Sequence, residues 1–179
     1  ARNIGPAQMT DQQAELGWRD GDIPVSQRFN DPYFSLQGGL DETRHVFLAG
    51  NDLPARFVDG FHVAELGFGT GLNFLATLMA WRKAGNEGRL HFTSFEAYPM
   101  AADDLARALE PFADVLPTHI LTDGSQANDF TLEVIEGDAR VTLPAWEGRA
   151  DAWYLDGFSP AKNPELWGAD LMHAVGAHT

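Results

Sequence analysis

The spacing of apolar residues from position 61 onward predicts an alternation of strands and helices. Residues 61–66 form a short apolar run that ends in a glycine-rich turn, and residues 72–83 then carry apolar side chains at helical spacing. The alternation continues, with strands expected at 90–95, 131–135 and 152–155 and helices at 100–109, 138–143 and 166–177. Pro99 suits the first turn of one helix, and Pro144 is expected to stop another. This order is typical of an α/β fold with a doubly wound, mostly parallel sheet between two layers of helices.

The first 60 residues follow a different pattern. Turn-forming Gly, Asn, Asp and Pro residues are frequent there, and only residues 44–48 read as a short strand. The segment also carries more aromatic side chains than a linker does, which favours a cap that packs. These aromatic residues are Trp18, Phe29, Tyr33, Phe34 and Phe47. We therefore expect a loop-rich amino-terminal cap with one short strand over residues 1–60 and an α/β core over residues 61–179.

The predicted core is expected to be incomplete at its carboxyl end. A strand at 152–155 would lie beside the strand at 61–66 and leave its other edge open and apolar. Open apolar edges of this kind promote aggregation. From the usual size of such domains, about 60 further residues are expected.

Composition excludes several classes of protein. The chain is 44% hydrophobic and 21% charged, which is ordinary for a globular domain. It has no cysteine, which excludes disulfides, thiolate zinc sites and a cysteine nucleophile, and its six histidines are scattered, so we expect no metal. No apolar run reaches the roughly 18 residues of a membrane span, and no charged-then-apolar leader opens the chain. We therefore expect a cytoplasmic protein.

The turn at residues 65–71 joins a predicted strand to a predicted helix and is the first candidate binding site. Its glycines allow a tight turn and a close approach of the backbone to a ligand. A dinucleotide fingerprint requires a third glycine where this chain has Leu72. A phosphate-binding P-loop requires a lysine, and nothing basic occurs between Glu65 and Arg82. Both phosphate interpretations are therefore rejected.

Acidic residues follow three successive strands of the predicted sheet, at the edge where ligands of such folds bind. Glu65 can offset the positive charge of S-adenosylmethionine, a sulfonium compound without phosphate. Glu96 can accept hydrogen bonds from ribose hydroxyls, and Asp138 can accept one from the adenine amino group, with Ala139 leaving room for the ring. The alternative for each acid is a helix cap or a solvated strand end. We assign to the cofactor Glu65, Gly67, Gly69, Gly71, Asn73, Glu96, Asp138 and Ala139.

A fourth acid, Asp156, ends the strand at 152–155 and is the candidate catalytic residue. Methyl transfer to an amine requires alignment and removal of a proton, with no metal and no covalent intermediate. Asp156 can orient the amine and accept its proton as a general base. Phe158 can form a wall of the pocket. Lys162 can reach an anionic group of the substrate, with an ordinary surface lysine as the alternative.

Several sequence blocks, taken together, resemble one known family. They are residues 24–26, 29–35, 39–44, 65–73, 94–96 and 155–167. The combination is similar to the methyltransferase domain of the bifunctional tRNA 5-methylaminomethyl-2-thiouridine biosynthesis proteins, and the resemblance extends from about residue 4 to residue 176. The glycine turn is generic, whereas the block at 156–167 and the amino-terminal blocks are specific to the family.

The resemblance implies methylation of the aminomethyl group on a wobble uridine in tRNA, with S-adenosylmethionine as the methyl donor. Asp156 is the residue carried over as catalytic. Tyr33, in the second block, is assigned to the substrate together with Phe158 and Lys162. Some members of the family carry a fused flavin-dependent oxidase, so FAD is expected only with such a separate domain.

The net charge of −14 opposes nucleic-acid binding, since proteins that bind phosphate backbones usually have a basic surface. We expect the affinity for tRNA to come from outside this chain: from the family's basic carboxyl-terminal stretch, from the oxidase, or from a partner. One alternative is a methyltransferase that acts on a small amine, which the acidity favours. A second is a non-catalytic module of the same fold that binds the cofactor.

Overall fold

The computed structural model describes residues 13–34, 38–156 and 162–179. Its centre is a four-stranded sheet formed by β4 (His62–Leu66), β5 (Leu90–Glu96), β6 (Phe130–Glu136) and β7 (Ala152–Leu155). The strands are all parallel, in the order β6-β5-β4-β7, and the expected parallel sheet is thereby confirmed. As predicted, β7 pairs with β4. Parallel pairing aligns the carboxyl ends of all four strands along one edge of the sheet.

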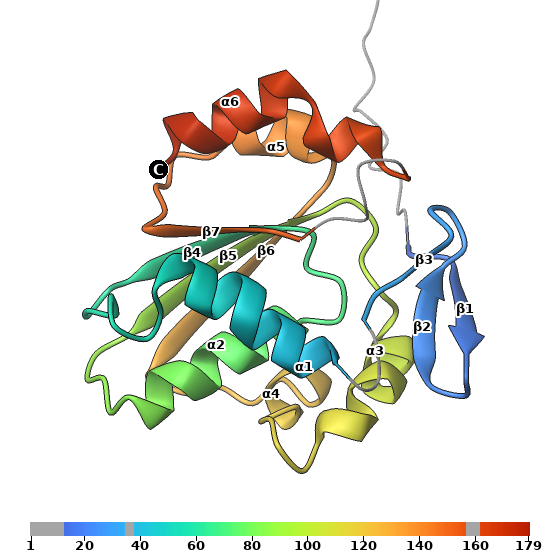
Figure 1. Ribbon diagram of the computed structural model, residues 1–179, viewed down its shortest axis with the longest axis horizontal. Helices are drawn as coiled ribbons and strands as arrows, with labels where there is room; N and C mark the ends of the chain where they lie inside the picture. The colour runs from blue at the N-terminus through green and yellow to red at the C-terminus, as the bar shows by residue number, and fades with distance from the viewer. Residues whose placement is uncertain (1–12, 35–37, 157–161) are drawn as a thin grey trace, which may run out of the picture.

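Helices cover both faces of this sheet (Figure 1). One layer contains α5 (Ala139–Ala145) and α6 (Ala169–Ala177), and the other contains α2 (Leu72–Lys83), α3 (Ala102–Leu109) and α4 (His119–Thr122). Each layer has its own apolar core. The larger one is built around Phe74, Trp81 and Phe92, and the smaller one around Leu66, Phe95 and Leu143. The two layers are what a doubly wound sheet requires to bury both of its faces.

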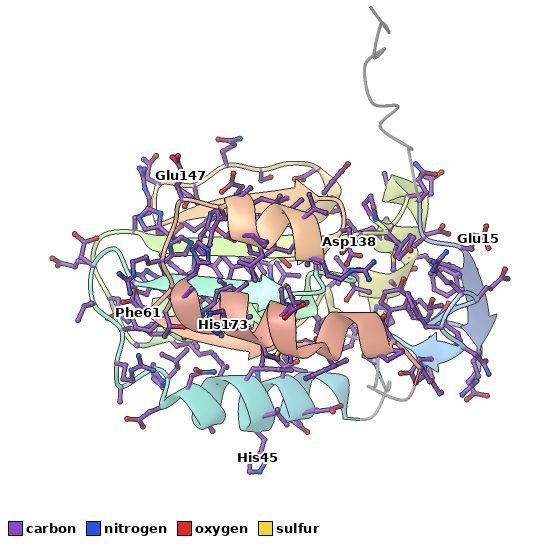
Figure 2. All side chains as sticks on the ribbon, turned by 90° about the horizontal axis from the view of Figure 1, so that it is seen from above. Glu15, His45, Phe61, Asp138, Glu147 and His173 are labelled. Carbon is purple, nitrogen blue, oxygen red and sulfur yellow. The ribbon has the colours of Figure 1, made fainter. Side chains whose placement is uncertain are left out.

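The first part of the amino-terminal segment, residues 13–34, lies at the carboxyl edge of the large sheet (Figure 1). Its three short strands, β1 (Leu16–Arg19), β2 (Ile23–Ser26) and β3 (Asp31–Pro32), form an antiparallel sheet beside α3 (Figure 1). The Arg107 guanidinium on α3 stacks on the Trp18 ring at 3.9 Å, and the Phe34 ring meets Phe112 at 5.2 Å. Figure 2 shows Phe61, just before β4, and Asp138, just after β6, toward opposite ends of the large sheet. A domain boundary at residue 60 stays a prediction.

The predicted strand at 44–48 is wrong, because this stretch is helical. It follows α1 (Gly39–Glu42) as a π-helical stretch, η1 (Thr43–Leu48), and a 3-10 turn, η2 (Ala49–Asn51), ends it. The five-residue spacing buries both Thr43 and Leu48, and the Phe47 ring packs at 5.3 Å from Tyr154 of β7. Packing on the core therefore overrides the local alternation on which the strand prediction rested.

The other predicted elements agree with the structure apart from their ends. The helix at 72–83 and the strand at 152–155 have the expected bounds. Pro144 does not stop α5, which includes it and ends at Ala145, because a proline in the last turn removes only one hydrogen bond. The expected helix at 166–177 is interrupted, since Gly168 is extended between a 3-10 turn, η4 (Pro164–Trp167), and α6. A further 3-10 turn, η3 (Glu110–Phe112), follows α3.

None of the helices in the described part of the chain has the length and apolar character needed to cross a bilayer.

Candidate active site

The site is centred on Glu65, near the end of β4, whose side chain is completely buried. The hydroxyl of Ser94, its register neighbour on β5, donates to Glu65 Oε1 at 2.8 Å. The amide of Asn73, in the first turn of α2, donates to Glu65 Oε2 at 2.9 Å. The glycine turn between β4 and α2 thus folds back so that the helix supplies a hydrogen-bond donor to the strand that precedes it.

Asn73 also links Glu65 to the candidate catalytic residue. Its Nδ2 donates to Asp156 Oδ2 at 2.6 Å, and its Oδ1 accepts a hydrogen bond from the Thr43 hydroxyl at 2.8 Å. Glu65 and Asp156, which the sequence analysis placed at the ends of two different strands, therefore share one amide donor. Their strands, β4 and β7, are adjacent in the sheet.

Burial determines the ionisation of this carboxylate pair. Desolvation raises the pKa of Glu65 well above its ordinary value, and the neighbouring Asp156 charge raises it further. Desolvation also raises the pKa of Asp156 to about 7, and the charges of Glu42 and Glu96 act in the same direction. The hydrogen-bond partners of both carboxylates here are neutral groups. Such a pair is stabilised in its charged form by a cationic ligand.

Glu96 holds the glycine turn. Its Oε2 accepts a hydrogen bond from the backbone of Gly69 at 2.9 Å, and its Oε1 accepts one from the backbone of Tyr98 at 2.9 Å. Burial raises the pKa of Glu96, although these backbone donors favour the carboxylate. At the start of the same turn, the Gly67 amide donates to the Phe95 carbonyl at 2.9 Å and continues the pairing between β4 and β5.

Two glycines of the turn are required for conformation and for space. Gly69 has φ +55° and Gly71 has φ +77°, a left-handed backbone that other residues rarely adopt. A Cβ on Gly71 would collide with Leu121 and would lie 2.8 Å from the Phe68 ring. A Cβ on Gly69 would lie 3.1 Å from the Tyr33 ring.

Tyr33, which we assigned to the substrate, therefore packs directly on the glycine turn. Burial, followed by the charge of Glu96, raises the pKa of its hydroxyl, so the side chain stays neutral. Local sequence patterns gave no indication of this contact, because the ring comes from the amino-terminal segment.

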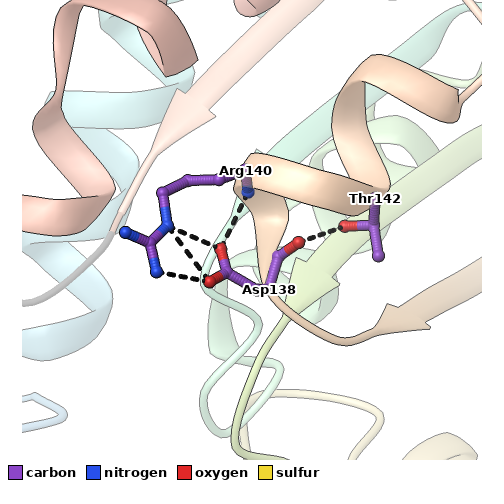
Figure 3. A network of polar contacts seen from close by, with 3 residues as sticks. All are labelled: Asp138, Arg140 and Thr142. Atoms are coloured by element: carbon purple, nitrogen blue, oxygen red, sulfur yellow. Dashed lines mark hydrogen bonds and ion pairs between the residues drawn. The ribbon is translucent and has the colours of Figure 1, made fainter. Parts of the chain in front are cut away.

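Asp138 occupies the amino-terminal cap of α5, which was the stated alternative to a cofactor contact. Its carboxylate accepts from the Arg140 backbone at 2.9 Å and from Arg140 Nη2 at 2.6 Å, and the Thr142 hydroxyl donates to its carbonyl at 3.2 Å (Figure 3). The side chain is about half exposed. Ala139, next to it, is buried. A cofactor role for Asp138 and Ala139 stays a prediction.

Lys162 pairs with the amino-terminal segment. Its Nζ donates to the Asn30 carbonyl at 2.7 Å and to Asp31 Oδ1 at 3.1 Å. These contacts join the chain after β7 to the start of β3. A substrate contact by Lys162 stays a prediction, and Phe158 lies outside the described residues.

Metal ligands do not gather in the described part of the chain, where no three His, Asp or Glu side chains could hold an ion together. His62 and His91 instead contact the hydroxyls of Thr93 and Thr131 at 2.8 and 2.6 Å.

Two further side chains belong to this site, Thr43 and Ser94, although we did not assign them from the sequence. Both lie within blocks that carried the family resemblance, residues 39–44 and 94–96. A signal for Ser94 was available, since it is a small polar residue two positions before Glu96 and therefore on the same face of the strand.

The chain is similar in sequence to known methyltransferases. Residues 106–179 match a family model described as S-adenosyl-L-methionine-dependent methyltransferase. Over 90% of its own length, the chain is 43% identical to the tRNA 5-methylaminomethyl-2-thiouridine biosynthesis bifunctional protein MnmC of Aeromonas salmonicida. It is 44% identical to the MnmC protein of Caulobacter sp. strain K31 over 96% of its length. It spans 28% and 32% of these two relatives.

The similarity in fold extends to solved structures. The crystal structure of MNMC2 from Aquifex aeolicus matches with a TM-score of 0.70 at 24% identity, over 93% of this chain and 56% of that one. The fold and the matches define the class of the chain as the S-adenosylmethionine-dependent methyltransferases of the doubly wound α/β type. Within that class the chain is MnmC-like, and its resemblance to the methyltransferase domain of the bifunctional family is confirmed.

Proposed function

We propose that this chain transfers a methyl group from S-adenosylmethionine to the aminomethyl nitrogen of 5-aminomethyl-2-thiouridine at the wobble position of tRNA. The observation that carries the proposal is the Glu65–Asn73–Asp156 cluster, in which a completely buried and a partly buried carboxylate share one neutral amide donor. The printed names of the relatives, which specify biosynthesis of tRNA 5-methylaminomethyl-2-thiouridine, support the choice of substrate.

The donor set fits the proposed cofactor. Glu65, which is completely buried, and Glu96, which is partly exposed, place carboxylates beside the turn where we propose a ligand that is cationic at sulfur and carries hydroxyls on its ribose. Gly67, Gly69 and Gly71 supply the left-handed backbone that the tight turn needs, and Asn73 fixes Glu65. Asp138 and Ala139 complete the proposed binding set. When bound, S-adenosylmethionine supplies an electrophilic methyl group.

Asp156 is the proposed general base. Its carboxylate lies at the end of β7, next to Glu65, where it can orient the substrate amine and accept the proton that the nitrogen must lose. With its pKa raised to about 7, Asp156 exchanges protons readily near neutral pH. Tyr33, Phe158 and Lys162 are the proposed substrate contacts, of which Tyr33 lies against the glycine turn.

The proposed partners follow from charge and length. With 26 acidic and 12 basic residues, this chain offers little attraction for a phosphate backbone. We place the main tRNA-binding surface outside it, in a further segment or in an FAD-dependent oxidase, fused or associated. The word bifunctional in the relatives' names, and the much greater length of those proteins, support a fused domain. A cytoplasmic location belongs to the same proposal.

Transfer of a labelled methyl group tests the function. The chain is incubated with labelled S-adenosylmethionine and with tRNA that either carries or lacks the unmethylated aminomethyl uridine. Incorporation only into the first tRNA supports the proposal. Equal incorporation into both tRNAs would refute the specificity for this nucleoside. Transfer to a free small amine with no preference for tRNA would instead support the small-amine enzyme, which the net charge of −14 favours.

A further inference from the structure

The Asn73 amide has two N–H groups, and both are used on carboxylates. One donates to Glu65 Oε2 at 2.9 Å and the other to Asp156 Oδ2 at 2.6 Å. The amide oxygen accepts from the Thr43 hydroxyl at 2.8 Å. Thr43 and Asn73 are only 4% and 5% exposed, so water does not compete for these contacts.

The opposite orientation of this amide would change the chemistry of the site. Turned by 180°, Asn73 would direct its oxygen at Glu65 and Asp156, an arrangement that requires both acids to carry a proton. Thr43 has one hydroxyl hydrogen and two acceptors within reach, Asn73 Oδ1 at 2.8 Å and the Gly39 carbonyl at 3.0 Å. When the hydroxyl donates to Asn73, the amide is held with its N–H groups on the carboxylates.

We infer that Thr43 is a positioning residue for methyl transfer, which orients the Asn73 amide so that Asp156 is held as the carboxylate that accepts the substrate proton. The inference rests on the proposed function, because Asp156 is the general base of that reaction.

The surroundings of Asp156 make the orientation important. Glu65 on β4, Glu42 on α1 and Glu96 on β5 are all acidic and oppose a charge on Asp156. Tyr154 of β7 also faces Glu65, and its hydroxyl contacts Thr77 at 2.9 Å. Among the described residues, the hydrogen bond from Asn73 favours the ionised form of Asp156. Loss of that orientation should leave the proton on Asp156 up to a higher pH.

The test removes the Thr43 hydroxyl and follows Asp156 directly. Thr43→Val keeps the shape of the side chain, and Thr43→Ser keeps the hydroxyl. Thr77→Val is the matched control, because Thr77 is also buried, but its hydroxyl donates to the Asn73 backbone carbonyl at 2.6 Å and not to the side-chain amide. Carbon-13 NMR titration of the Asp156 carboxyl, assigned with Asp156→Asn, reports its protonation without any substrate.

We expect the titration midpoint of Asp156 to rise by about one pH unit in Thr43→Val and to stay near wild type in Thr43→Ser and Thr77→Val. The single-turnover rate of methyl transfer should fall about fivefold at pH 7 in Thr43→Val and recover at high pH, because a midpoint that moves about one unit above 7 lowers the ionised fraction of Asp156 from about one half to about one tenth. Thr43→Ala removes the same hydroxyl with less bulk and replaces the Val variant if that variant does not fold.

A wild-type midpoint in Thr43→Val, or an equal shift in Thr77→Val, would overturn the inference. A rate loss that is the same at every pH would also overturn it, because that result indicates a structural role. Failure of the wild-type protein to methylate tRNA would refute the proposed function alone, since the NMR midpoints still decide whether Thr43 acts on Asp156.

Discussion

At the scale of single residues, Asp156 is the proposed general base, since its carboxylate follows β7 and its pKa is raised. Asp156→Ala should lower the rate constant for methyl transfer by about 10² to 10⁴, the usual contribution of a positioned acid or base. The affinity for S-adenosylmethionine should change little, because in this account Glu65 and Glu96 hold the cofactor. Rapid-quench transfer and equilibrium binding measure the two quantities. A variant with full turnover would remove Asp156 from the mechanism and would favour a non-catalytic module.

Protonation of Asp156 should also be visible in the stability of the fold. Its folded-state pKa of about 7 lies above the ordinary 3.8 of an aspartate, so the folded protein binds the proton more tightly than the unfolded chain. The stabilising effect is complete below about pH 4 and is lost as the pH rises to about 7. Wild-type stability should therefore fall by about 2 to 3 kcal/mol between pH 5 and pH 8 from this group alone.

Asp156→Asn should remove this part of the pH dependence, because the amide does not titrate. Urea denaturation of both proteins at pH 5 and pH 8 checks the difference. The variant should gain stability relative to wild type as the pH rises, and a parallel response of the two proteins would contradict the assigned protonation of Asp156.

At the scale of elements, the packing of side chains against the glycine turn can be tested by substitution. Gly71→Ala and Gly85→Ala both place a side chain on a left-handed backbone, with φ +77° and +69°, at a cost of about 1 kcal/mol each. Only at Gly71 would the new Cβ meet other atoms, those of Leu121 and Phe68, whereas nothing lies within 4 Å at Gly85. Thermal denaturation should show the larger loss for Gly71→Ala, and equal losses would contradict the packing of the turn.

The sequence predicted the sheet and the edge at which its acidic residues lie, because both depend on local periodicity. The helix at 72–83 and the strand at 152–155 follow from apolar spacing alone, and the strand ends then locate Glu65, Glu96 and Asp156. The error at 44–48 arose where packing of Leu48 on the core, and not local pattern, determines the structure.

Contacts between distant segments could not be predicted in this way. Thr43 reaches Asn73 across 30 positions, and Lys162 reaches Asp31 across 131. For Asp138, the sequence could not distinguish between two roles. Its position at a strand end suits both a cofactor contact and a helix cap, and the cap with Arg140 is what the structure contains.

At the scale of the whole molecule, the net charge of −14 opposes binding to the proposed tRNA substrate. Among the described residues, five ion pairs join an Arg or Lys to an Asp, which neutralises those cations locally. We expect this chain alone to bind tRNA weakly, with a salt slope no steeper than about −2, since each phosphate contact contributes about −0.9. Filter binding between 50 and 200 mM salt, about the usual range for such slopes, measures it. Tight binding with a steep slope would place the tRNA surface within these 179 residues.

Calorimetric titration of S-adenosylmethionine tests the account most directly, because every step depends on a cationic cofactor beside Glu65. Glu65→Gln is compared with Glu136→Gln, which changes an exposed acid at the end of β6. Loss of the buried charge should weaken binding about 10- to 100-fold, the usual effect of a hydrogen bond to a charged group, while Glu136→Gln should bind as wild type does. Equal affinity of Glu65→Gln and wild type would contradict the central claim.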